Sequence, residues 1–143
     1  MTELFDTHCH LDMSHFKDDL PSVIEKAREA GVKYILTVGT DIKKKKKAIE
    51  IANRFEGVYA SVGLHPHDAK DMNDRTIEQL KQLAKEPKVV AVGETGLDYH
   101  YNHSPREIQK EAFRAQIELA IQLNLPLIVH SRKAKEDTLG ILN

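Results

Sequence analysis

Five short apolar runs recur along the chain, and a longer helical pattern separates each run from the next. The runs are Leu4–Asp6, Tyr34–Val38, Val58–Val62, Val89–Val92 and Leu125–Val129. They are apolar on both faces, which is typical of strands in a parallel sheet covered by helices. The turn after the first run lacks the glycine-rich phosphate loop of an open doubly wound sheet. The pattern therefore favours an α/β fold of the (β/α) TIM-barrel type, with the first five β-α units present, which makes an incomplete barrel because a full one needs ~250 residues.

Capping signals predict where several helices begin. A helix start favours proline in the first turn and a short polar side chain as the N-cap. The expected positions are Pro21 in the first turn of the first helix, Thr40 or Asp41 as the cap of the second, Asn73 or Asp74 as the cap of the third, and a capping box over Ser104–Glu107 for the fourth.

Composition limits the class of protein. Hydrophobic residues make up 41% of the 143 residues and charged residues 30%, as in a globular domain. No apolar run approaches the ~20 residues that cross a bilayer, and no signal peptide is visible. Cys9 is the single cysteine, which excludes an intramolecular disulfide, and we expect a cytoplasmic location. The formal net charge of −1 argues against a broadly basic nucleic-acid coat.

Two histidines follow the first apolar run. In a strand, residues i and i+2 point to the same face, so His8 and His10 are expected to project together while Cys9 points the other way. Two ligands of one metal ion need that arrangement. An isolated pair of this kind is more often accidental, and its weight depends on further ligand types at the ends of other strands.

Such ligand types do occur after the other runs. In a barrel, functional groups lie at the carboxyl ends of the strands. The residues in these positions are His8 and His10 after the first run, His65 and His67 after the third, Glu94 and Asp98 after the fourth, and His130 and Arg132 after the fifth. A carboxylate beside three imidazoles suits a divalent ion of the zinc, manganese or iron type, and a carboxylate can bridge two ions. The histidines expected to be turn or surface residues are His15, His67, His100 and His103.

Two further stretches have competing interpretations. Gly93 and Gly96 could let the backbone turn sharply and approach a substrate, but a plain left-handed turn with an exposed Glu94 fits the local sequence equally well. The Lys43–Lys47 run is expected to form a solvated helix face, with contact to a nucleic-acid backbone as the alternative.

Three long motifs occur in order along the chain, at Leu4–Asp12, Val92–Tyr99 and Leu125–Arg132, with a softer fourth at Gly63–His67. On these motifs the chain resembles the TatD-type metal-dependent deoxyribonucleases, which are amidohydrolase-like metallohydrolases. The resemblance implies a hydrolase that cleaves phosphodiester bonds of DNA with metal-activated water, without membrane association.

The same resemblance implies roles for individual residues. The implied metal ligands are His8, His10, Glu94 and His130, which would hold two divalent ions (Zn, Mn, Mg or Fe) with Glu94 as the bridge. His65 and Arg132 are implied to hold substrate phosphates, and with Glu94 they form the implied catalytic set.

One departure from the family pattern bears on activity. Complete members resemble eight-stranded barrels with a further histidine ligand after the sixth strand and an aspartate after the eighth, and neither strand is among these residues. An open sheet would expose both edge strands. We therefore expect residues 1–143 to be a single domain that is the N-terminal portion of a longer barrel. The alternatives are a dimer through the open edge, a degenerate remnant, a protein that binds metal or a partner without catalysis, and an amide or ester hydrolase acting on a small molecule.

Overall fold

Strands and helices alternate along the whole chain in the computed structural model, which describes residues 2–39 and 42–143. Within these ranges the strands are β1 Leu4–Cys9, β2 Val32–Val38, β3 Val58–Val62, β4 Val89–Asp98 and β5 Leu127–Arg132. The helices are α1 Leu20–Glu29, α2 Ile42–Arg54, α3 Asp74–Leu83, α4 Arg106–Leu123 and α5 Lys135–Leu142, with short 3₁₀ turns η1 Ser14–Phe16 and η2 Pro66–Asp71. Among the described helices, none is both long enough and apolar enough to span a membrane.

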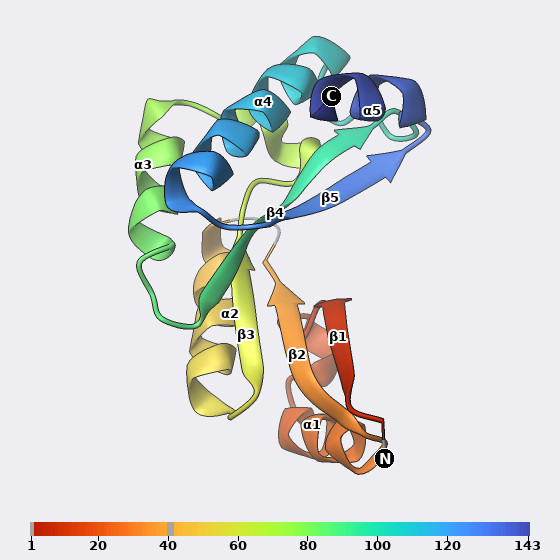
Figure 1. Cartoon of the computed structure of the whole chain (residues 1–143), viewed down its shortest axis with the longest axis vertical. Helices are drawn as coiled ribbons and strands as arrows, with labels where there is room; N and C mark the ends of the chain where they lie inside the picture. Colours follow the sequence, from red (N-terminus) through yellow and green to blue (C-terminus); the bar gives the residue numbers. More distant parts are fainter. Residues whose placement is uncertain (1, 40–41) are drawn as a thin grey trace.

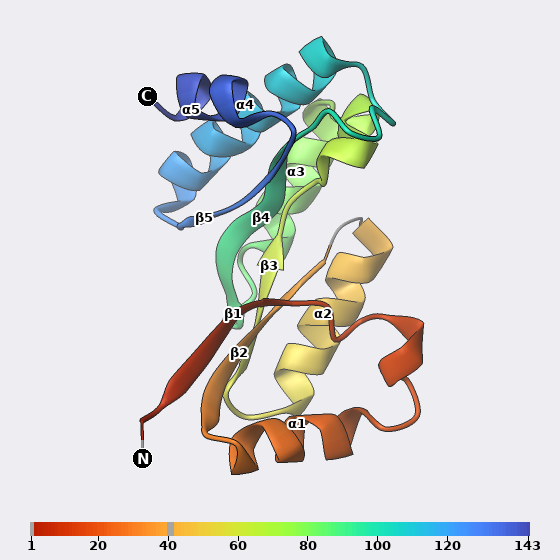
Figure 2. The same cartoon turned by 90° about the vertical axis from the view of Figure 1, so that its right-hand side faces the viewer.

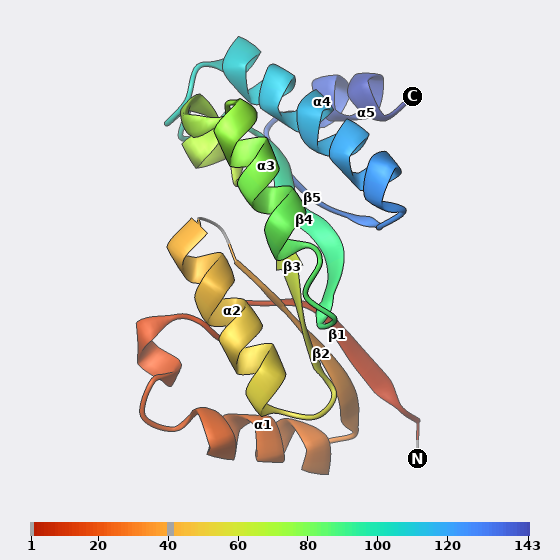
Figure 3. The same cartoon turned by 90° about the vertical axis from the view of Figure 1, so that its left-hand side faces the viewer.

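The strands form one parallel sheet in the order β1-β2-β3-β4-β5, so each strand pairs with its neighbour in sequence (Figure 1). Helices α1 to α4 cover the outer face of this sheet, as Figure 3 shows, and the view from the other side in Figure 2 shows the strands of its inner face. The expected arrangement of parallel β-α units in a barrel-type sheet is therefore confirmed.

The main core lies between the sheet and the helices. It includes Ile24 of α1, Ala52 of α2, Val62 of β3, Leu80 of α3 and Leu119 of α4. A smaller cluster on the inner face contains Leu36, Val38 and Ala91. β1 forms one edge of the sheet and its residues are largely exposed, as predicted for an open barrel.

Strand β4 differs most from its prediction. The strand was expected to end at Val92, but it continues through Asp98 because it pairs with β5 from Val92 onward, for example Gly96 with His130 and Asp98 with Arg132. Of the two interpretations of this stretch, the plain turn with an exposed Glu94 is wrong, because Glu94 lies within β4 and is only 6% exposed.

The two glycines beside Glu94 let neighbouring strands approach each other. Gly96 has φ +135°, and a Cβ atom there would collide with the carbonyl oxygen of His130. A Cβ on Gly93 would lie 2.6 Å from the carbonyl oxygen of Ile128. These glycines therefore serve strand packing, and a close approach of the backbone to a substrate at this point stays a prediction.

The helix caps were predicted in part. Asn73 caps α3, since its Oδ1 accepts a hydrogen bond from the Thr76 N–H at 3.0 Å. The predicted capping box of α4 is wrong because the Ser104 hydroxyl donates to the carbonyl of His67 at 2.9 Å, and Pro105 takes the N-cap position. The proposed caps of α2, Thr40 and Asp41, lie outside the described residues.

The lysine run at the start of α2 is not simply a solvated face. Lys44 and Lys46 are exposed, but the Lys45 side chain is fully buried. Lys47 is half-buried, and its Nζ donates to the carbonyl of Asp12 at 2.6 Å. Part of the run therefore stabilises the chain next to β1, where a solvated face was expected.

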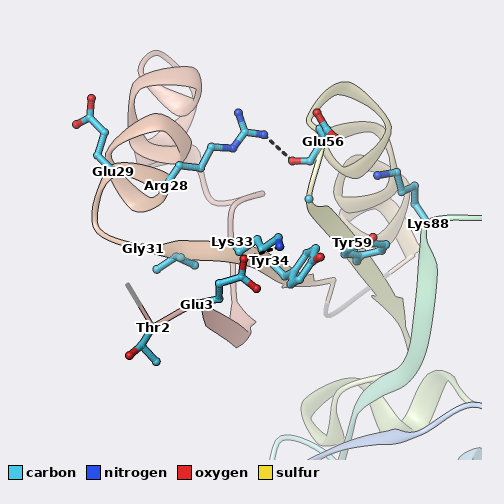
Figure 4. Close-up of a pocket in the computed structure, with 12 residues that line it drawn as sticks. Thr2, Glu3, Arg28, Glu29, Gly31, Lys33, Tyr34, Glu56, Tyr59 and Lys88 are labelled. Atoms are coloured by element: carbon cyan, nitrogen blue, oxygen red, sulfur yellow. Dashed lines mark hydrogen bonds and ion pairs between the residues drawn. The ribbon is translucent and has the colours of Figure 1, made fainter.

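A cavity of about 600 Å³ opens at the amino-terminal ends of the strands (Figure 4). Tyr34, Tyr59 and Lys88 line it, and at its rim the Arg28 guanidinium donates to the carbonyl of Glu56 at 2.6 Å. The strand-end histidines do not line this cavity, because they lie at the carboxyl ends of the strands.

Candidate metal centre

Glu94 of β4 lies at the centre of the strand-end residues. Its Oε2 atom is 3.3 Å from Nε2 of His8, which lies in β1, and 3.8 Å from Nε2 of His10, which directly follows that strand. Its Oε1 atom is 2.9 Å from Nδ1 of His130 on β5. The two carboxylate oxygens thus face imidazoles from opposite edges of the sheet.

His10 is held in an orientation suited to ligation. Its Nδ1 donates to the carbonyl of Val38 at 2.8 Å, because a carbonyl can only accept. With its proton on Nδ1, the ring turns Nε2 towards Glu94, 3.8 Å from Oε2. Metal-binding histidines commonly have this second hydrogen bond, which fixes the tautomer. The side chain of Cys9 points away as predicted, with its Sγ 3.5 Å from the carbonyl of Leu36, and burial raises the pKa of its thiol to about 12.

A second carboxylate, Asp98, is fully buried behind His130. Its Oδ2 lies 3.0 Å from Nε2 of His130 and 3.0 Å from Nε2 of His67. Its Oδ1 accepts the backbone N–H groups of His100 and Tyr101, each at 3.0 Å. Asp98 therefore orients the ring of His130 from the side opposite Glu94.

The pairing of Asp98 with His67 was not predicted. His67 was expected to be a turn residue, and its ring does not belong to the groups that could hold an ion in the described chain. The available signal was the spacing of Glu94 and Asp98, which places both side chains on one face of a strand. That signal requires β4 to continue past Val92, which its short apolar run did not indicate.

His65 lies beside Glu94 and His130, with its ring centroid 4.6 Å from that of His130. Its Nδ1 accepts the backbone N–H of His67 at 3.2 Å. Burial lowers the pKa of His65 to about 4, and the neighbouring imidazoles of His130 and His67 add to this effect against the opposing charge of Glu94. The His65 ring is therefore neutral at pH 7.

The electrostatics of the centre favour ionised carboxylates. Burial alone would raise the pKa of Glu94, but the hydrogen bond with His130 and the nearby imidazoles of His65 and His8 bring it down to about 2. Burial also opposes ionisation of Asp98, and its hydrogen bonds hold its pKa well below the usual range. The hydrogen bond to Glu94 raises the pKa of His130.

Two groups of side chains have the spacing that a metal ion requires, and they share Glu94. His8 and His10 form one group with it, and His65 and His130 form the other, with ligand atoms within 4.8 Å of one another in each. Imidazole nitrogens and carboxylate oxygens are ligands of zinc, manganese and iron, so the donor set fits a divalent ion.

The remaining strand-end and loop residues lie around this centre. Arg132 is exposed, and its guanidinium lies 5.1 Å from the ring centroid of Tyr101. His100 and His103 lie in the loop between β4 and α4, and His15 is exposed against Phe16. None of these three histidines belongs to the two groups found among the described residues.

Two buried glutamines of α4 hold the centre from behind, and the sequence reasoning missed both. Gln109 accepts the backbone N–H of Asp98 at 2.7 Å and donates to the carbonyls of Asp98 at 3.1 Å and Ser104 at 2.8 Å. Gln116 binds the backbone of Leu64, the residue before His65. The signal was two glutamines seven residues apart, on the helix face that also contains Ala112 and Leu119.

Comparisons with known proteins show which family the chain belongs to. The family described as TatD related DNase matches residues 5–143. YabD of Bacillus subtilis, an uncharacterized metal-dependent hydrolase, is 47% identical over 97% of this chain and 54% of its own length. The 3′-5′ ssDNA/RNA exonuclease TatD of Cronobacter sakazakii is 40% identical over 98% of this chain and 53% of its own length.

A solved structure shows the same fold. The crystal structure of YjjV, a TatD homologue from Escherichia coli, has a TM-score of 0.89 and 34% identity, covering 97% of this chain and 54% of that one. The chain spans about half the length of the relatives that it matches.

Proposed function

Because the chain belongs to the TatD related DNase family, we propose that it acts in a metal-dependent hydrolase that cleaves phosphodiester bonds of DNA. The observation that carries this proposal is the buried Glu94 carboxylate, whose two oxygens face histidines of different strands. A single buried carboxylate between imidazoles on both sides is suited to hold two cations at once.

In this proposal, each carboxylate oxygen of Glu94 would bind one of two divalent metal ions. His8 and His10 would hold one divalent ion with Oε2, and His130 would hold a second ion with Oε1. The candidate ions are Zn, Mn, Mg and Fe. When bound, such ions polarise a phosphate and supply hydroxide from water near neutral pH.

His65 is suited to hold the substrate. Its Nδ1 accepts the N–H of His67, so the proton of the neutral ring lies on Nε2, which makes that atom a donor. A donor can bind a phosphate oxygen, whereas a metal ion requires a lone pair. We therefore assign His65 to the phosphate, although its position beside Glu94 would also suit a ligand.

Arg132 supplies a second phosphate contact in this proposal. Its side chain is exposed at the end of β5, on the same strand as His130. A guanidinium can donate two parallel hydrogen bonds to a phosphate, which fixes its orientation as well as its charge. DNA is the proposed substrate. RNA is a second candidate substrate, because related proteins are named ssDNA/RNA exonucleases.

The test is cleavage of single-stranded DNA by the 143-residue chain with divalent metal added. We expect cleavage that a chelator abolishes and that His130→Ala abolishes, because that variant removes one of the groups facing Glu94. His15→Ala is the matched control, since His15 is an exposed histidine outside both groups, and it should cleave at the wild-type rate.

Two results would contradict the proposal. Metal binding without turnover would favour a metal-binding protein that lacks catalysis. Metal-dependent hydrolysis of small amides or esters with no cleavage of DNA would favour the other hydrolase class.

A further inference from the structure

Two exposed aromatic rings are stacked in the loop between β4 and α4. The ring centroids of Tyr101 and His103 lie 5.4 Å apart with only 6° between the planes. Tyr101 is 51% exposed, and His103 is exposed as well. Neither ring belongs to a hydrophobic cluster of the described chain, so their stacking does not serve the core.

This ring pair lies next to the candidate metal centre. The ring of His67 links the two, since its centroid lies 4.6 Å from that of His103, 5.6 Å from that of Tyr101 and 6.4 Å from that of His130. The guanidinium of Arg132 lies 5.1 Å from the centroid of Tyr101. The rings of His130, His67 and the Tyr101–His103 pair therefore form a row that leads outward from the metal centre. The Arg132 guanidinium, which is proposed to bind phosphate, lies beside this row.

The loop that presents the rings is held by buried polar contacts. Asp98 accepts the backbone N–H of Tyr101, and Ser104 donates from its hydroxyl to the carbonyl of His67 and accepts the N–H of Lys70 at 3.2 Å. Gln109 binds the backbone at both ends of the loop. These contacts use the backbone of Tyr101. Its ring packs edge-on against His100, with the centroids 4.5 Å apart, and Tyr101 is still 51% exposed. The ring pair is therefore positioned before any ligand binds.

From this arrangement we infer that Tyr101 and His103 form a stacking platform for a base of single-stranded nucleic acid, with Arg132 on the adjoining phosphate. The inference rests on the proposed function for the phosphodiester at the centre. Exposed rings beside a guanidinium are the common way to bind unpaired bases, because every base has a flat face. Bases inside a duplex are already stacked on their neighbours, so the platform selects an unpaired strand.

The test measures binding separately from cleavage. Fluorescence anisotropy of a labelled oligothymidylate is recorded with the full chain in a chelator, which prevents metal-dependent cleavage. The comparison probe is an abasic oligonucleotide of the same length, which keeps the phosphates and lacks the bases. Base–aromatic stacking is worth roughly 1–3 kcal/mol, so Tyr101→Ala should weaken oligothymidylate binding between about 5-fold and about 150-fold.

Three controls complete the expected pattern. Tyr101→Phe keeps the ring and should bind within about twofold of wild type, since stacking does not need the hydroxyl. Tyr34→Ala removes a tyrosine at the opposite end of the strands and should change nothing. Neither Tyr101 variant should alter binding of the abasic probe. If Tyr101→Ala loses its folded circular dichroism spectrum, His103→Ala is measured instead and the same loss is expected.

The inference is overturned if the alanine variants bind oligothymidylate as tightly as wild type, or if they lose the same affinity for the abasic probe. It is also overturned if the wild-type chain does not distinguish the two probes. Failure of the proposed function would differ, since it would show as absent cleavage with metal while base-dependent binding in the chelator persists.

Discussion

The side-chain amide of Gln116 on α4 makes two hydrogen bonds to the backbone of Leu64: the Leu64 N–H donates to Oε1 at 2.7 Å, and Nε2 donates to the Leu64 carbonyl at 3.0 Å. Both residues are buried. Leu64 immediately precedes His65, so this amide fixes where the loop after β3 places the His65 ring. The strand β3 that precedes the loop and the helix α4 that holds it are separated in sequence by three elements, η2, α3 and β4.

We predict that Gln116→Leu destabilises the protein by about 2 kcal/mol or more. Leucine has a similar volume, but it leaves two buried backbone groups without partners, and each such group costs roughly 1–3 kcal/mol. Urea denaturation followed by circular dichroism measures the loss. Gln122→Leu is the matched control because Gln122 is exposed on the same helix, and its effect should stay within about 0.5 kcal/mol. Equal effects of the two variants would contradict the assigned role.

Asp98 should control metal affinity without being a ligand. We predict that Asp98→Asn lowers the affinity for zinc or manganese by about 10- to 100-fold, because loss of a carboxylate partner disturbs the orientation of a metal-binding histidine. Isothermal titration calorimetry measures the affinity, with Asp71→Asn as an exposed control. An affinity equal to wild type would show that the contact of Asp98 with His130 does not orient that ring.

Gly96 and Gly140 form a second matched pair. Gly96→Ala should destabilise by about 1–3 kcal/mol or more, since the residue has a positive φ and its Cβ would meet the His130 carbonyl. Gly140 lies within α5 with nothing near its Cβ position, so Gly140→Ala should stabilise by roughly 0.5–1 kcal/mol. Thermal denaturation distinguishes them, and a shift in the same direction for both variants would contradict the packing of β4 on β5.

Tyr99 gives a prediction about alkaline pH. Burial and the hydrogen bond that its hydroxyl donates to Asp137 at 2.6 Å raise the pKa of Tyr99 to about 12. Unfolded tyrosine ionises near 10, so the stabilisation is complete below pH 10 and is lost as the pH rises towards 12. The free energy of unfolding of the wild type should therefore fall between pH 10 and pH 12, and that of Tyr99→Phe should fall less. Parallel declines would contradict the raised pKa.

Local sequence patterns predicted the elements whose partners are close in the chain. β3 has the expected bounds Val58–Val62, and Asn73 caps α3 through a residue three positions later. The fold class followed from the repeat of apolar runs, because a parallel sheet imposes the same burial on each strand.

The errors occurred where contacts distant in sequence decide the structure. β4 continues through Gly93 and Gly96 because β5 supplies its hydrogen bonds, and an apolar pattern does not report that pairing. The Ser104 hydroxyl was expected to cap α4, but it binds the backbone of η2 instead. His8, His10, Glu94 and His130 could be predicted to lie together because all four occur at the carboxyl ends of parallel strands. The contact of Asp98 with His67 could not, because it depends on the length of β4.

The central claim is that imidazoles from β1 and β5 share cations with the carboxylate of Glu94. The most direct measurement is anomalous X-ray diffraction from crystals of the chain grown with zinc or manganese. We expect one anomalous peak bonded to His8, His10 and Glu94, and a second bonded to Glu94 and His130. Strong peaks only at other histidines, such as His15 or His100, with no density beside Glu94, would contradict the account.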